Sequence, residues 1–302
     1  MLFLYGTTPP RATTADDTVQ SVGEKLAVRL RDHPVDGIVV YDIQDESGRT
    51  QLARPFPYAR TVDPRDYSRT LATRTAFATI IYKCVGDLDE TAWLAWLTET
   101  AKAYGARCLS IVGRPTSGVR YPLSLPAAIR LAATHSAGFT VGGVVIAERH
   151  NEQRSESARL LTKSADGCRY FISQTVYHPE ATERLLGDYA RDCDAAGVRP
   201  RRIVLTFAPA GREKTMTFLK WLGVQIPFET ETAIRSAANP ITKSTDICRD
   251  NLRRILDHEY ADQIPLGINV ESVSINRDEI DASVDLFDAL HGVMRERFGR
   301  RG

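Results

Sequence analysis

The chain has 302 residues, of which 43% are hydrophobic and 25% are charged, as in an ordinary globular protein. Its 39 Lys and Arg residues nearly balance 38 Asp and Glu residues, and the net charge of +1 argues against a nucleic-acid-binding surface. No apolar run reaches the roughly 18 residues that a membrane-spanning helix needs. We therefore expect neither nucleic acid nor a membrane as a partner.

Short runs rich in β-branched residues recur along the whole chain and predict strands. There are eight, at residues 2–5, 37–41, 79–85, 107–112, 140–146, 170–176, 203–207 and 268–274. Helical patterns lie between them. Asp87 is expected to cap a helix over residues 90–104 that ends at Gly105, and two further helices are predicted over 212–222 and 279–298.

Eight strands that alternate with helices predict an α/β protein of the TIM type, a single (β/α)8 barrel domain over residues 1–302. Residues 229–262 exceed that scheme and predict an extra helical segment before the last strand. A doubly wound open sheet is the alternative. It is disfavoured because no G-x-G-x-x-G sequence follows the first strand.

The cysteine pattern bears on the cellular compartment. The five cysteines are an odd number and form no C-x-x-C pair, so we expect neither a disulfide framework nor a structural zinc site. A reducing cytoplasm is the expected location. The sequence does not decide between a monomer and a homo-oligomer.

Polar residues gather where the predicted strands end. In a barrel these ends meet at one rim, where active sites are built. The candidates, in chain order, are Asp42, Gln44, Lys83, Arg114, Glu148, His150, Gln174 and Glu271. We expect Lys83 and Gln44 to contact a substrate, since a lysine can neutralise a carboxylate or phosphate and an amide can pair with polar edges.

Two carboxylates are candidate catalytic acids. Glu271 stands in an otherwise apolar strand, and a partly desolvated carboxyl there has a raised pKa suited to donating a proton. The alternative is an ion pair of Glu271 with Lys83 or Arg277. Asp42 is the second candidate; a metal site in its acidic loop is not favoured, because the spacing matches no known metal-binding loop.

Several motifs resemble, in order and spacing, those of the methylenetetrahydrofolate reductase family. They are residues 82–85 (YKCV), 142–150 (GGVVIAERH), 163–167 (KSADG), 171–174 (FISQ) and 274–277 (SINR). The resemblance runs over roughly residues 1–300 and is strongest from position 80 to position 177. The order and spacing of these motifs together carry the resemblance.

This resemblance implies a (β/α)8 barrel that binds FAD and passes a hydride from NAD(P)H to a tetrahydrofolate derivative. It also implies that Gln174 binds the pterin ring and that Arg277 lies near the folate. Glu148, His150 and Lys163 would then lie near the flavin.

The chain departs from the family at the positions of the chemistry. Where members carry Glu-Phe-Phe-Pro-Pro with a catalytic Glu, residues 6–10 read GTTPP, so Gly6 replaces the acid. The family's Arg-Gly-Asp appears as residues 112–114 (VGR), which places Arg114 beside the cofactor. One hypothesis is therefore a reductase acting on a folate one-carbon substrate. The alternative is a barrel without flavin that binds folate, or that transfers a methyl or one-carbon group without redox chemistry.

Overall fold

Eight parallel strands close into a barrel in the order β1 to β8, with β8 paired to β1. The computed structural model describes residues 1–45, 50–113 and 121–299. The strands are β1 (Phe3–Thr7), β2 (Gly37–Val40), β3 (Ala78–Cys84), β4 (Cys108–Val112), β5 (Thr140–Val145), β6 (Tyr170–Thr175), β7 (Arg202–Phe207) and β8 (Leu266–Glu271). The TIM-type prediction is confirmed, and the open sheet is excluded.

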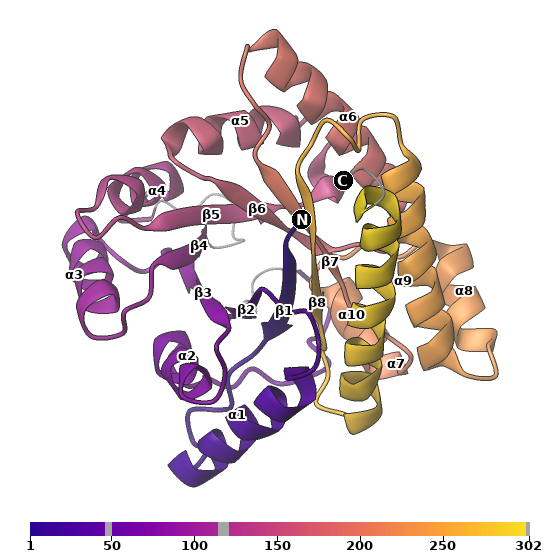
Figure 1. Ribbon diagram of the computed structural model, residues 1–302, viewed down its shortest axis with the longest axis horizontal. Helices are drawn as coiled ribbons and strands as arrows, with labels where there is room; N and C mark the ends of the chain where they lie inside the picture. Colours follow the sequence, from indigo (N-terminus) through magenta and orange to yellow (C-terminus); the bar gives the residue numbers. More distant parts are fainter. Residues whose placement is uncertain (46–49, 114–120, 300–302) are drawn as a thin grey trace.

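Helices surround this barrel (Figure 1). They are α1 (Asp16–Leu30), α2 (Pro64–Ala72), α3 (Glu90–Lys102), α4 (Leu125–Thr134), α5 (Glu156–Asp166), α6 (Pro179–Ala195), α9 (Pro240–Asp257) and α10 (Arg277–Phe298), with a short 3-10 turn, η1 (Ala147–Arg149), after β5. Two more helices, α7 (Glu213–Trp221) and α8 (Phe228–Ser236), precede α9. Since α9 packs against both α6 and α10, α7 and α8 are the additions to the simple scheme.

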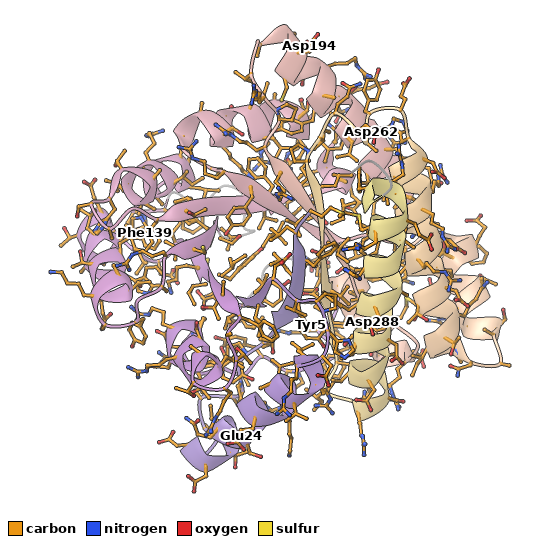
Figure 2. All side chains as sticks on the ribbon, in the orientation of Figure 1. Tyr5, Glu24, Phe139, Asp194, Asp262 and Asp288 are labelled. Carbon is orange, nitrogen blue, oxygen red and sulfur yellow. The ribbon has the colours of Figure 1, made fainter. Side chains whose placement is uncertain are left out.

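Alternation along the strands separates an inner from an outer core, because successive side chains of a strand point to opposite faces. The inner core is small and apolar: Leu4, Val39, Ile80, Tyr170, Ile172 and Val204. The outer core is larger and fills the space between sheet and helices. Tyr5, which is labelled in Figure 2, belongs to this outer core. It shares a 2.7 Å hydrogen bond with Ser283 of α10.

Helix caps shift some boundaries from those expected. Asp89 rather than Asp87 caps α3, and its carboxylate accepts from the Ala92 N–H at 2.8 Å. The last helix begins at Arg277 instead of residue 279. Strand β8 ends at Glu271, three residues earlier than predicted. Glu271 is therefore the last residue of its strand, at the carboxyl-terminal mouth of the barrel.

The described ranges also bear on membranes and metals. Within residues 1–45, 50–113 and 121–299, no helix combines the length and the apolar character needed to cross a membrane. The same residues contain no group of three His, Cys, Asp or Glu side chains that could hold a metal ion.

Candidate active site

Glu271 lies at the centre of a polar cluster inside the barrel mouth. Its carboxylate accepts hydrogen bonds from the hydroxyls of Tyr41 and Thr175, the latter at 3.4 Å. One layer deeper, the Asn269 amide donates to the Tyr41 hydroxyl at 3.0 Å and to Thr206 at 3.3 Å. Four strands, β2, β6, β7 and β8, or the residue directly after them, supply the cluster.

A bulge in β6 brings Thr175 into this cluster. Strict alternation from the inward-facing Ile172 would place Gln174 inside the barrel and Thr175 outside. The register of β6 against β7 shifts between Ile172 and Thr175, so that Thr175 pairs with Thr206. Bulges commonly re-aim side chains in this way next to functional sites.

Burial sets the proton affinities of the cluster. Desolvation raises the pKa of Glu271, and the hydrogen bonds from Tyr41 and Thr175 offset part of that rise. Burial and the neighbouring carboxylate raise the pKa of Tyr41 well above its usual value, so its hydroxyl stays a donor. The Asn269 side-chain oxygen is buried and has no hydrogen-bond partner among the described residues. The cluster thus offers a carboxyl group that retains its proton to higher pH, next to an unused acceptor.

The raised pKa of Glu271 predicts a pH-dependent difference between the wild type and Glu271→Gln. The folded protein binds this proton more tightly than the unfolded chain, whose reference pKa is 4.5. The resulting stabilisation is complete below pH 4.5 and is lost as pH rises through the folded-state pKa. Urea unfolding from pH 4 to 8 should therefore favour the glutamine variant increasingly until the difference levels off. A difference that does not change with pH would contradict this placement.

Gly6 makes room for the cluster. It pairs in register with Glu271 on the neighbouring strand. A Cβ at position 6 would lie 2.9 Å from both Cε2 and the hydroxyl oxygen of Tyr41, and 3.1 Å from Cβ of Glu271. The space that a side chain on β1 would need is therefore filled by the side chains of Tyr41 and Glu271.

Asp42, Lys83 and Gln44 form a separate group next to the mouth. Asp42 accepts from the Lys83 ammonium at 3.2 Å, from the Cys84 N–H at 3.1 Å and from the Gln44 amide at 2.8 Å. The Lys83 ammonium also lies 5.6 Å from the Trp96 ring of α3, on the outer side of the sheet. The expected alternative pairing of Glu271 with Lys83 or Arg277 is wrong, because Lys83 pairs with Asp42 and the carboxylate of Glu271 bonds to hydroxyls.

Gln174 and Glu148 bind the segment that follows α7. The Gln174 amide donates to the Leu222 carbonyl at 2.7 Å. The carboxylate of Glu148 accepts from the Gln225 backbone N–H, while burial raises its pKa. The structure thus brings these two predicted ligand residues together, although through contacts with protein backbone.

His150 and Lys163 are engaged between the sheet and its helices. One ring nitrogen of His150 lies 2.6 Å from the Asp188 carboxylate of α6, and the other accepts from the Glu156 N–H at 3.2 Å. Lys163 donates to the Val144 carbonyl at 2.6 Å, and burial lowers its pKa. The hydrogen-bond partners of His150 and Lys163 are different from those of Glu148, so the structure does not join the three residues in one cluster.

One predicted residue of the described part of the chain lies elsewhere. Arg277 begins α10 with an 88% exposed side chain and pairs with Asp281 at 3.4 Å, in a surface groove shared with α1. The structure does not bring it to Glu271. Arg114 lies outside the described residues.

A segment of residues 50–62, here called the strap, reaches from β2 to α7. Phe56 of the strap contacts Phe218 with ring centroids 5.4 Å apart, and the Arg54 guanidinium lies 4.7 Å from the Trp221 ring centroid. Its far end runs beside the loop after β1, where Val62 donates to the Pro10 carbonyl at 2.8 Å. Since β1 and β8 are the strands between β2 and β7, the strap lies on the carboxyl-terminal side of Gly6 and Glu271.

Sequence reasoning missed Tyr41 and Arg54. Tyr41 carried a usable signal, because it continues the inward alternation of Val39 and adds a polar tip where the strand ends. Arg54 carried none, since it stands in a proline-containing loop without periodicity. Its place in the fold depends on the contact between the strap and α7, which the sequence does not display.

These features define a (β/α)8 barrel with an acidic, hydroxyl-lined site at its carboxyl-terminal mouth. No protein-family model matches the chain, and no curated protein matches it. A solved structure from Clostridium thermocellum is similar over 97% of this chain and 95% of its own, with 29% sequence identity and a TM-score of 0.81. That protein is described as uncharacterized and as binding two copies of 5-methyl-5,6,7,8-tetrahydrofolic acid.

A second solved structure is more distant. N-(5'-phosphoribosyl)anthranilate isomerase from Pyrococcus furiosus is 10% identical over 97% of this chain and all of its own, with a TM-score of 0.47. That likeness is too weak to bear on the function of this protein.

Proposed function

We propose that this protein binds a reduced folate at the carboxyl-terminal mouth of the barrel, with Glu271 as the residue that contacts the pterin ring. The observation that carries the proposal is the likeness, over nearly the whole of both chains, to a protein described as binding 5-methyltetrahydrofolate. The polar cluster around Glu271 supports it, because it is a converging set of polar groups at the barrel end where ligands bind.

The chemistry of the cluster suits a pterin. The ring presents an amino group and a ring N–H side by side, and a carboxylate can accept both hydrogen bonds. Tyr41 and Thr175 hold the Glu271 carboxyl from two sides and so fix its direction. Because its pKa is raised, the same carboxyl can also carry a proton to a ring nitrogen.

The residues that the family resemblance assigns to FAD do not fit that role here. His150 uses both ring nitrogens within the protein, and Lys163 uses its ammonium on a backbone carbonyl. Glu148 accepts from the backbone of the segment after α7. These contacts favour folate binding, with methyl or one-carbon transfer, over flavin chemistry at these residues.

A second candidate function is reduction of the bound folate with NAD(P)H. One observation favours it: Glu271 stands directly beside Gly6 in the strand register, at the place where the reductase family has its acid on the first strand. In this candidate Glu271 supplies the proton that accompanies the hydride. Flavin absorbance of the purified protein, or folate-dependent oxidation of NAD(P)H, would support it over the first.

Calorimetric titration with 5-methyltetrahydrofolate under anaerobic conditions tests the proposal. We expect saturable binding by the wild type and a loss of about 10- to 100-fold in affinity for Glu271→Ala, because a charge-assisted hydrogen bond contributes about 1.5–3 kcal/mol. Glu296→Ala, on the exposed side of α10, is the matched control and should bind like the wild type. An undetectable interaction with the wild type would refute folate binding, and full affinity in Glu271→Ala would remove Glu271 from the site.

A further inference from the structure

Arg54 carries a guanidinium group that the protein leaves partly unsatisfied. Its Nε and Nη1 atoms are buried and have no hydrogen-bond partner among the described residues. The group lies over aromatic rings, with distances of 4.7 Å to the Trp221 centroid, 5.6 Å to Tyr58 and 5.7 Å to Phe218. Ring faces attract the positive charge. They do not accept the hydrogen bonds that the guanidinium donates in its own plane.

Arg65 provides an internal comparison. It too lies over two rings, Trp96 at 4.9 Å and Tyr104 at 4.8 Å. Its donors, however, are used by two carboxylates, Asp63 at 2.9 Å and Glu99 at 2.7 Å. Arg54 has the same aromatic setting without either carboxylate. Buried donors of a charged group are costly when they have no partner, so the comparison identifies a carboxylate as the missing group.

The position of Arg54 indicates where that carboxylate comes from. The strap that carries it lies on the carboxyl-terminal side of Gly6 and Glu271, the side from which a ligand enters a barrel of this kind. A tetrahydrofolate has a pterin ring at one end and a p-aminobenzoyl-glutamate tail, with two carboxylates, at the other. With the pterin at Glu271, a tail that leaves the barrel through this mouth would pass on the side where the strap lies.

We propose that Arg54 is the recognition group for the carboxylate tail of the folate, and that the aromatic rings around it pack against the p-aminobenzoyl part. This inference rests on the proposed function and adds a second anchoring point to it. A guanidinium suits the role because it pairs with a carboxylate through two parallel hydrogen bonds, which fixes direction as well as charge. Glu271 then selects the ring, and Arg54 selects ligands that carry the acidic tail.

Two ligands separate the roles of the two anchors. We would titrate the protein with 5-methyltetrahydrofolate and with 6-methyl-5,6,7,8-tetrahydropterin, which has the ring but no tail. Arg54→Met should weaken binding of the folate by about 10- to 100-fold, the loss expected for charge-assisted hydrogen bonds. It should change binding of the tetrahydropterin by less than about threefold, which is below 1 kcal/mol. The affinity of Arg54→Lys for the folate should lie between those of the wild type and Arg54→Met, since lysine retains the charge without the paired hydrogen-bond geometry.

Arg60→Met is the matched control, because Arg60 is an exposed arginine of the same strap, and it should leave both affinities unchanged. Equal losses for both ligands in Arg54→Met would overturn the inference and point to a general effect on the site. Unchanged folate binding in that variant would overturn it as well. If the wild type binds neither ligand, the proposed function fails, and the inference that rests on it fails too.

Discussion

Replacing Glu279 with alanine should lower the free energy of unfolding by about 3–5 kcal/mol, the usual cost of removing one partner from a buried charged network. Glu279 is fully buried in the first turn of α10. Its carboxylate accepts from the backbone N–H groups of Gly211 and Arg212, both at 3.2 Å, and from the Thr215 hydroxyl at 2.8 Å. Alanine leaves these three donors without their acceptor.

Loss of the Glu279 hydrogen bonds should also affect the segments around the candidate site. The three donors belong to the loop after β7 and to the start of α7, the helix that carries Phe218 and Trp221. Loosening this loop should free the strap from α7 as well. Urea unfolding followed by circular dichroism measures the stability, and fluorescence of Trp221 in a variant with the other two tryptophans replaced reports on the strap contact.

Glu279→Gln is the informative control for this variant. The amide retains one oxygen acceptor and the shape of the side chain, so we expect it to lose clearly less stability than alanine. Asp278→Ala provides a surface comparison, since Asp278 is exposed, pairs with the exposed Arg212 side chain and accepts from the Glu279 backbone N–H at 3.0 Å, and its loss of stability should be clearly smaller than that of Glu279→Ala. Equal stability of the wild type and Glu279→Ala would contradict the role assigned to these hydrogen bonds.

The fold was predictable because its signals are local and repeated. Each strand contributes a short β-branched run, and the alternation with helices allows few other architectures. Glu271 could be selected for the same reason, since a carboxylate in an apolar strand stands out from its neighbours. The boundary errors, such as Asp87 in place of Asp89, arose where two acidic residues competed for one helix start.

The rest of the site depends on features that a single sequence does not display. Because of the bulge in β6, Thr175 and not Gln174 faces the inside of the barrel mouth. No residue type in that strand predicts a bulge. The partner of Lys83 depends on which strands are neighbours and on their register. Arg54 gains its meaning only from a contact between segments that are more than 150 positions apart in the chain. These contacts form only when the barrel closes, so no single segment of the sequence predicts them.

Gly6 on β1 and Glu271 on β8 occupy neighbouring inward positions at the barrel mouth. Neighbouring inward positions of a barrel compete for the same volume, because the interior is close-packed. A large side chain on β1 and the Glu271–Tyr41 pair cannot both occupy the mouth at their present positions. The glycine at position 6 is therefore what allows Tyr41 and Glu271 to occupy the mouth together.

The variant Gly6→Ala tests whether Tyr41 and Glu271 need the space that the glycine leaves. The new Cβ would lie 2.9 Å from the Tyr41 ring and hydroxyl, so Tyr41 must rotate away and lose its hydrogen bonds with Asn269 and Glu271. We expect a loss of about 1–3 kcal/mol in the free energy of unfolding, as for other overpacked interiors. Affinity for the proposed folate should fall as well, because the Glu271 carboxyl loses the group that orients it.

The double variant Gly6→Ala with Tyr41→Phe separates crowding from other effects of the added methyl group. Removal of the hydroxyl takes away one of the close contacts and both of its hydrogen bonds, so the cost of the alanine should be smaller in the phenylalanine background. Gly292→Ala, within α10, is the matched glycine control. A Cβ there meets nothing within 4 Å, and alanine in a helix should raise stability by about 0.5–1 kcal/mol. If Gly6→Ala is as stable as the wild type and shows no coupling to Tyr41, then position 6 tolerates a side chain and the Tyr41–Glu271 pair does not depend on the glycine.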